Sequence, residues 1–445
     1  MFFKSAKIRG GRGEGRWRVF APRALEAEGR IDPVAIGRTG PGPGAGARPS
    51  KAAPAVARPA PDGRKGGGTD LKGRIGTASF AFRGYDRTNL GRSAELLEHP
   101  VYGPVVRAVL DEASGISSEA LTRPIDLAAR IRARAASSLD TFAEDIATIV
   151  AMQMAQLRLL EEFFGVPVRE AKQSFGYSIG ELSTVILGGV FSLEQLLPVP
   201  LGFAADCAAM SEDATMAVLF SRSSVLQMKD VQALCMAVCS QGKGLVGPSA
   251  YLSPNTVLLI GQGDTLDRIE RAIPEFLPER TNLRRKPHRW PPMHTPLVWR
   301  RNIPNRTAVA LYQIEGGMRK PTPTVVSCVT GAASFDGLNS RDILIRWVDH
   351  PQLLWDVIHK TLVTGVELVI HVGPAPNLIP ATFERLGNNV AKQLDNRYLQ
   401  LLGRGVCSSM NRYTWLPRRL PKAALIRALF LEHVILEDWL LEQSV

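Results

Sequence analysis

A serine held between two glycines is the residue of this sequence best suited to covalent chemistry. Gly176, Ser178 and Gly180 have the GxSxG spacing, in which a serine occupies the tip of a tight turn from a strand into a helix. The first glycine avoids crowding behind the serine, and the second lets the helix approach the strand. Because this spacing also arises by chance in glycine-rich chains, a helix-capping serine in a glycine-rich turn is the alternative interpretation.

The residues around Ser178 favour the nucleophile. QSFG before it has the pattern of a short strand, and ELSTVIL after it that of an apolar helix. This order places the serine hydroxyl at a helix N-terminus, where the helix dipole and the backbone N–H of Ile179 stabilise a developing oxyanion. A serine nucleophile also needs a base that removes its proton.

One histidine lies in a segment that holds an imidazole rigidly. His294 occurs in PPMHTPL, where prolines on both sides restrict the backbone. His359 and His433 fall in helical patterns, which indicates surface or interface positions. We therefore take His294 as the candidate base among the seven histidines, which are His99, His288, His294, His350, His359, His371 and His433.

The positive charge of the chain is concentrated at its N-terminal end. Residues 1–76 carry 16 Lys and Arg against 6 Asp and Glu, so they supply +10 of the net charge of +12. Their Gly, Pro, Ala and Arg content predicts a disordered tail. The remainder is nearly neutral, so we expect no nucleic-acid partner. A nucleic-acid arm or an organelle address is the alternative role for the tail.

The cysteines and the apolar runs set the expected compartment. The five cysteines are odd in number and irregularly spaced, which favours neither a disulfide framework nor a metal site. No apolar run approaches the roughly 18 residues that a membrane span needs, and no secretory signal is evident. We therefore expect a cytoplasmic protein with no bound metal and no membrane association.

The alternation of short apolar runs with helical patterns predicts an α/β fold. Residues 77–212 and 284–385 are expected to form one large α/β subdomain. Residues 213–283 alternate strand, helix, two strands and helix, and are expected to form an inserted α+β subdomain. Helical segments predict a C-terminal extension over residues 386–445.

Four segments together resemble a known family across about residues 78–385. The family is that of the malonyl-CoA:acyl-carrier-protein transacylases and the acyltransferase domains of polyketide and fatty-acid synthases. The resemblance implies an α/β-hydrolase-like large subdomain with a ferredoxin-like insertion. The segments are FGYSIGELSTVILGGVFSLEQLL, ATMAVLF with YLSPNTVLLIGQ, PPMHTPLV, and the run from RDILIRWVDHPQLLW to GVELVIHVGPAPNL.

The resemblance also implies an activity. Such enzymes move an acyl group from coenzyme A to the phosphopantetheine thiol of an acyl carrier protein, in fatty-acid or polyketide biosynthesis, without a bound cofactor. By position, Ser178 is the nucleophile and His294 the base. The backbone N–H groups of Ile179 and Tyr85 form the oxyanion hole, and the backbone carbonyl of Trp347 orients the histidine.

This sequence departs from the family pattern at the acyl pocket. Phe203 stands where malonyl-using members place an arginine, so we expect a pocket that favours an uncharged acyl group. Met293 and Tyr177, which replaces a histidine, are expected to line it. A thioester hydrolase on the same fold and a non-catalytic scaffold that binds carrier protein are the alternatives.

Overall fold

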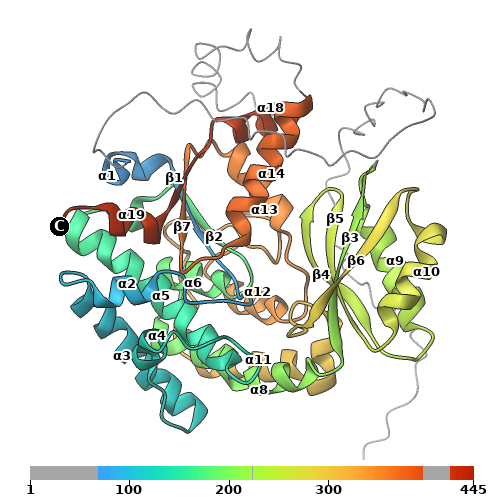
Figure 1. The fold of residues 1–445 in the computed structure, drawn as a ribbon, viewed down its shortest axis with the longest axis horizontal. Coiled ribbons are helices and arrows are strands. Elements are labelled where there is room, and N and C mark those ends of the chain that lie inside the picture. Colours follow the sequence, from blue (N-terminus) through green and yellow to red (C-terminus); the bar gives the residue numbers. More distant parts are fainter. Residues whose placement is uncertain (1–68, 223, 394–420) are drawn as a thin grey trace, which may run out of the picture. The chain divides into compact units, whose positions relative to one another are not determined.

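The computed structural model describes residues 69–222, 224–393 and 421–445 of the 445-residue chain, and these residues belong to one compact unit, Ala55–Val445. In this part of the chain the structure contains two four-stranded sheets with helices packed on them (Figure 1). The α/β class expected from the sequence is confirmed. The expected tail, up to residue 68, lies outside the described residues.

The first sheet is parallel, in the order β2-β1-β7-β8. Every residue of its first three strands is buried, and β1 and β7 accordingly read as largely apolar runs. The register aligns Phe82 with Gly176 and Val372, so these three strands end at one edge. Binding sites of open parallel sheets form at this edge. The strands are β1 (Ala78–Phe82), β2 (Gln173–Gly176), β7 (Leu368–Val372) and β8 (Glu432–Ile435).

Helices cover both faces of the parallel sheet. Phe80 and Phe82 of β1 belong to a core cluster that includes the apolar residues of α5 (Phe142–Phe164). Ala81, between them, belongs to a second cluster with the apolar residues of α13 (Leu354–Val363). Since successive side chains of a strand point to opposite faces, these clusters form the two sides of a three-layer arrangement.

The other helices of the large subdomain surround this arrangement, with α3 packed along α5 and α6 following the strand β2 directly. They are α2 (Ser93–Glu98), α3 (Gly103–Leu121), α4 (Leu127–Arg132), α6 (Gly180–Leu187), α7 (Leu193–Leu196), α8 (Pro198–Met210), α11 (Ile303–Gln313), α12 (Ser340–Trp347), α14 (Leu378–Gln393) and α18 (Pro421–Ile426).

The second sheet is antiparallel, in the order β4-β5-β3-β6. Its chain order of strand, helix, two strands, helix and strand is the ferredoxin-like arrangement. The two helices lie on one face of the sheet (Figure 1) and share with it a core that includes Leu219, Leu234 and Ile269. The elements are β3 (Ala214–Ser221), α9 (Met228–Cys239), β4 (Val246–Ser253), β5 (Thr256–Gln262), α10 (Thr265–Phe276) and β6 (Thr281–Arg289).

The inserted subdomain ends later than the expected boundary at residue 283. Strand β6 continues to Arg289, and Arg284 and Arg285 pair with Val218 and Ala217 of β3. The basic run at residues 284–289 is therefore an edge strand. Its consecutive basic residues obscured the strand, because edge strands tolerate charged residues that central strands exclude.

The N-terminal boundary expected at residue 76 is also displaced. Asp70 caps the short helix α1 (Leu71–Arg74), and its side chain accepts a hydrogen bond from Gly73 N. Leu71 and Ile75 are buried in the main core. The folded part of the chain therefore includes these residues, which the sequence analysis had assigned to the tail.

The helical extension expected over residues 386–445 also contains a strand, which the sequence analysis did not predict. Residues 432–435 form β8, which pairs in parallel with β7, before the helix α19 (Leu436–Glu442) begins. The helical periodicity of LEHVILEDWLL is overridden here, because the edge of β7 offers backbone hydrogen bonds to an extended segment. Residues 394–420 lie outside the described part of the chain.

Candidate active site

Ser178 occupies a strained turn at the carboxyl edge of the parallel sheet. Strand β2 ends at Gly176, helix α6 begins at Gly180, and Ser178 has a φ of 55°. A left-handed backbone at a non-glycine residue costs free energy and persists only where surrounding contacts impose it. The turn therefore has the geometry of a nucleophile elbow.

The two flanking glycines are required by close backbone contacts. A Cβ on Gly176 would overlap the backbone of Gly180 and Glu181, and a Cβ on Gly180 would overlap the backbone of Phe82 at the end of β1. The GxSxG spacing predicts both of these close backbone contacts. One joins the turn to its own helix, and the other joins the helix to the neighbouring strand.

The structure brings Ser178 and His294 together, although 116 residues separate them in the sequence. Ser178 Oγ lies 2.8 Å from His294 Nε2, and His294 Nδ1 lies 2.6 Å from the backbone oxygen of Trp347. Since a carbonyl oxygen only accepts, Nδ1 carries the proton and Nε2 offers its lone pair to the serine hydroxyl. This tautomer is the one that a general base requires.

Burial keeps the imidazole of His294 neutral. Desolvation lowers the pKa of His294 to about 4, and the hydrogen bond to Trp347 and the field of Asp349 only partly oppose it. His294 is 4% exposed, and its backbone N–H donates to Val348 O at 2.8 Å. At neutral pH the ring is therefore unprotonated and able to accept the serine proton.

Trp347 contacts both members of the pair. Its backbone oxygen accepts from His294 Nδ1, its indole Nε1–H donates to the backbone oxygen of Ser178 at 2.9 Å, and its ring lies edge-on to the imidazole. The sequence analysis assigned Trp347 only the carbonyl contact. The contact through the indole was missed, because a side-chain bond to a residue 169 positions away leaves no local signal.

The two backbone groups expected to form an oxyanion hole lie on segments next to Ser178. Ile179 directly precedes helix α6, and Tyr85 follows Gly84, on which a Cβ would lie 3.1 Å from Ser178 Cβ. The Tyr85 ring packs against Phe142 and Trp290, with ring centroids 4.9 and 5.4 Å away. Both N–H groups are thus at the end of the sheet where Ser178 lies.

A buried arginine fixes the loop that carries Tyr85. Arg83 is 1% exposed and donates to Gly84 O at 2.7 Å, Pro374 O at 2.6 Å and Asn89 Oδ1 at 2.8 Å. Burial lowers the pKa of its guanidinium to about 10, so the group stays charged at neutral pH. Arg83 thereby ties the loop after β1 to the loop after β7, which the sequence analysis did not foresee.

The sequence analysis also did not foresee the role of Glu181, which lies in the first turn of α6. It is fully buried, accepts hydrogen bonds from Ser327 Oγ and from Cys328 N, the latter at 3.0 Å, and connects the helix to the loop around residue 327. Desolvation raises the pKa of Glu181 to about 8. The residue supports the elbow helix from behind rather than facing Ser178 Oγ.

Two of the three residues expected to line an acyl pocket lie in one apolar cluster beside the pair. Phe203 of α8 is 3% exposed, with its ring centroid 6.4 Å from that of Trp347. Met293 adjoins His294, and the thiol of Cys207, on α8, lies 3.3 Å from its sulfur. Tyr177 instead packs against the cluster on the other face of the sheet, so the structure does not bring it to Phe203.

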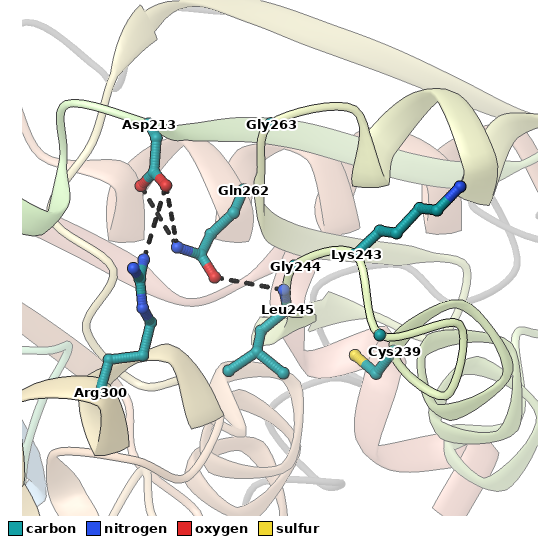
Figure 2. A pocket seen from close by; sticks show the side chains of 9 residues that line it. Asp213, Cys239, Lys243, Gly244, Leu245, Gln262, Gly263 and Arg300 are labelled. Atoms are coloured by element: carbon teal, nitrogen blue, oxygen red, sulfur yellow. Dashed lines mark hydrogen bonds and ion pairs between the residues drawn. The ribbon is translucent and has the colours of Figure 1, made fainter.

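A separate hollow of about 490 Å³ lies where α9, β5 and the segment after His294 meet, and neither Ser178 nor His294 lines it. Figure 2 shows Asp213 between Gln262 and Arg300, with Gln262 Nε2 3.1 Å from the Asp213 carboxylate and Arg300 Nη1 3.5 Å from it. These contacts pair the charges of Asp213 and Arg300 with each other.

Two further findings concern all residues that the structure describes, 69–222, 224–393 and 421–445. Among them, no group of three or more His, Cys, Asp or Glu side chains is arranged to hold a metal ion. In the same part of the chain, no helix has both the length and the apolar character to cross a membrane.

The comparison with known sequences gives one partial match. No protein-family model matches the chain. A curated relative, the spectinabilin polyketide synthase system protein NorB of Streptomyces orinoci, is 29% identical over 203 residues, which are 42% of this chain and 9% of that protein. The chain thus matches less than a tenth of the length of this relative.

The comparison with solved structures shows the fold. FabD of Acinetobacter baumannii superposes with a TM-score of 0.57 at 20% identity, over 70% of this chain and 91% of that one. The acyl carrier protein S-malonyltransferase of Vibrio cholerae gives 0.54 at 21% identity, over 67% and 90%. A malonyl-transacylase in complex with a type II polyketide synthase carrier protein gives 0.53 at 20% identity, over 68% and 91%. The resemblance noted in the sequence is therefore confirmed at the level of the fold.

Proposed function

We propose that this chain, which has the fold of the acyl carrier protein malonyltransferases, is an acyltransferase that carries its acyl group on Ser178. The observation that supports this most directly is the 2.8 Å contact of Ser178 Oγ with the Nε2 of a buried His294, whose other nitrogen is held by Trp347 O. The donor is a coenzyme A thioester and the acceptor is the phosphopantetheine thiol of a carrier protein, in fatty-acid or polyketide biosynthesis.

In the first half-reaction, Ser178 Oγ attacks the thioester carbonyl while His294 Nε2 takes the hydroxyl proton. The tetrahedral oxyanion accepts hydrogen bonds from the N–H groups of Ile179 and Tyr85. When the intermediate collapses, the carbon–sulfur bond breaks and the imidazolium returns its proton to the coenzyme A thiolate. The products are acyl-Ser178 and free coenzyme A.

The second half-reaction reverses these roles. The carrier-protein thiol gives its proton to His294 Nε2 and its sulfur attacks the acyl ester, and the imidazolium then protonates the departing Ser178 oxygen. The enzyme returns to its starting state and the acyl group leaves as a carrier-protein thioester. We place this reaction in the cytoplasm, since Cys207, Cys235, Cys239 and Cys328 are free thiols in the structure.

We further propose that the acyl group is uncharged. Phe203, Met293 and Cys207 place apolar atoms beside Trp347 and His294. A malonyl carboxylate buried against such a surface without a cationic partner costs several kcal/mol, whereas an alkyl chain gains free energy from the same burial. The cluster therefore supports acetyl or longer alkanoyl groups over malonyl.

Intact-protein mass spectrometry after mixing with malonyl-, acetyl- or octanoyl-coenzyme A tests both proposals. We expect the mass of one acetyl or octanoyl group to appear on the wild type and on Ser240→Ala, which removes an exposed hydroxyl, and not on Ser178→Ala. Phe203→Arg is expected to improve malonyl loading roughly 10- to 100-fold relative to octanoyl, the worth of a charge-assisted hydrogen bond.

Each contrary outcome has a distinct meaning. Efficient malonyl loading of the wild type contradicts the assignment of Phe203. Loading followed by rapid loss of the acyl mass without carrier protein favours a hydrolase. No Ser178-dependent loading with any of the three donors contradicts the acyltransferase and favours a non-catalytic scaffold.

A further inference from the structure

A buried glutamine between α12 and α13 contacts both members of the serine–histidine pair. Gln352 is fully buried, and its Oε1 accepts a hydrogen bond from Ser178 N at 3.0 Å. Its Nε2 lies 3.3 Å from His294 Nδ1. Neither the GxSxG motif nor the histidine loop points to this residue, which is 174 positions from Ser178.

Gln352 and Trp347 together hold the strained backbone of Ser178. The N–H of Ser178 donates to Gln352 Oε1 at 3.0 Å, and its carbonyl accepts from Trp347 Nε1 at 2.9 Å. Both polar backbone groups of the left-handed residue are therefore bound by side chains from one segment. Such bonds offset the strain of a φ of 55°, which an unsupported serine would relax.

The orientation of the amide follows from these partners. Because Ser178 N–H only donates, it must face Oε1, and Nε2 must face His294. His294 Nδ1 already donates its proton to Trp347 O. Gln352 Nε2 and His294 Nδ1, which are both donors, therefore face each other at a distance of 3.3 Å. The positive end of the amide dipole therefore lies against the imidazole and disfavours its protonated form.

The backbone of Gln352 is fixed by the inserted sheet. Its N–H donates to Ser249 O at 2.9 Å and its carbonyl accepts from Tyr251 N at 2.8 Å, both on β4. The hydroxyl of Ser249 also donates to Met293 O at 3.1 Å, next to His294. One strand of the insertion thus anchors the glutamine that holds Ser178 and the residue that precedes His294.

We infer that Gln352 is a positioning residue that holds Ser178 in its reactive backbone conformation and keeps the ring of His294 neutral, while Trp347 O holds the Nδ1 proton. The inference rests on the proposed serine chemistry but goes beyond it, since it assigns the alignment of the pair to a side chain anchored on the inserted subdomain. Asp349 is the charged group whose field acts on His294 in the opposite direction, and it is itself bonded to His350 and Trp299.

Two substitutions separate these roles. In Gln352→Glu a carboxylate replaces the amide, so it accepts from Ser178 N and also from His294 Nδ1. The pKa of His294 then rises. The pH at which the acylation rate falls to half its maximum therefore increases by at least one unit. Gln352→Met conserves volume but cannot accept from Ser178 N, so the acylation rate constant falls at least tenfold at unchanged acyl-coenzyme A affinity.

The experiment measures single-turnover acylation of Ser178 from pH 3.5 to 8, together with an NMR titration of the His294 ring. Gln262→Met is the matched control, because Gln262 is also buried but bonds Asp213 and Leu245 in the inserted subdomain. It is expected to keep the wild-type rate and pH profile.

The NMR titration needs no substrate, so it tests the inference even if no donor acylates the wild type. An upward shift of the His294 titration in Gln352→Glu supports the inference. An unchanged His294 titration in Gln352→Glu, or a wild-type acylation rate in Gln352→Met, overturns it.

Discussion

At the scale of single residues, the proposed chemistry depends on how each atom of the pair is held. Ser178 Oγ faces Nε2 of a histidine whose Nδ1 proton is engaged by Trp347 O, so the hydroxyl meets a lone pair rather than a second proton. Burial then removes the competing imidazolium form. Among the described residues no carboxylate bonds His294, and the backbone oxygen of Trp347 provides the orientation that an aspartate provides in serine triads.

This arrangement predicts an unusually acidic limit to the activity. The pKa of His294 is lowered from 6.5 to about 4, so the reactive neutral form persists through the weakly acidic range. We expect the rate of Ser178 acylation to hold down to about pH 5 and to be half-maximal near pH 4. Rapid-quench mass spectrometry across this range gives the midpoint, and a midpoint near 6.5 would contradict the burial of His294.

The same lowered pKa affects stability with a definite sign. Between pH 4 and 6.5 an unfolded chain binds a proton at His294 that the folded chain does not. The contribution of His294 to the free energy of unfolding therefore rises with pH in this window, by up to about 1.4 kcal/mol per pH unit, and is lost on acidification.

The sequence singled out Ser178 and His294 by local motifs, and the structure places the two side chains in contact. Ser178 and His294 lie in segments whose glycines and prolines mark a special backbone. Gln352, Glu181 and Arg83 carry no such mark, since each acts through partners that only the folded chain brings near. What these three residues share is that each is polar and buried, and burial is visible only in the structure.

At the scale of elements, the turn that carries Ser178 forms because the backbones of β1, β2 and α6 approach closely. A side chain on Gly176 or Gly180 would prevent this approach. Gly176 faces the backbone of Gly180 and Glu181, and Gly180 faces that of Phe82. The strand register that aligns Phe82 with Gly176 therefore fixes the position of the serine relative to the loop carrying Tyr85. The packing of the sheet therefore determines where Ser178 lies.

We expect Gly176→Ala and Gly180→Ala each to lower the free energy of unfolding by about 1–3 kcal/mol, because an added methyl forces the backbones apart. Gly115→Ala, in the interior of α3 with no atom within 4 Å of the new methyl, is the matched control. It should stabilise the protein by roughly 0.5–1 kcal/mol. Urea titrations measure all three, and equal stability of the Gly176 and Gly115 variants would contradict the account of the elbow.

Element prediction from the sequence worked for the buried strands and failed at the sheet edges. β1, β3 and β7 are apolar runs, and the alternation of such runs with helical patterns predicted the α/β class. β6 is rich in Arg and Lys, and β8 lies inside a helical periodicity. At edges, pairing with an existing strand decides the conformation, and local composition does not reveal it.

At the scale of the whole chain, the first described residues, 69–74, bond the last described segment, residues 432–439. Arg74 and Thr69 both bond the carboxylate of Glu432 at the start of β8, and Trp439 Nε1 donates to Thr69 O at 3.2 Å. Glu437 accepts from the backbone N–H of Ala375, in the loop after β7, at 2.8 Å. The last residues of the chain are therefore part of the fold around the site.

Deletion of residues 432–445 should abolish cooperative folding. It removes β8 together with the buried Leu436 and Leu440, each worth about 1.5–3 kcal/mol, against a typical total stability of about 5–15 kcal/mol. Deletion of the exposed Ser444 and Val445 alone is the control and should leave the thermal transition unchanged. Near-UV circular dichroism on heating compares the two, and a wild-type transition in the longer deletion would contradict this role.

The central claim, that Ser178 passes an acyl group from coenzyme A to a carrier protein, is tested most directly in a single transfer. Octanoyl-loaded enzyme is freed of coenzyme A, mixed with a holo carrier protein, and both proteins are weighed over time. The account predicts that the octanoyl mass leaves the enzyme and appears on the carrier protein, and does neither when the carrier lacks its phosphopantetheine thiol. Octanoyl mass that stays on the enzyme, or leaves it equally fast without the carrier thiol, would contradict the account.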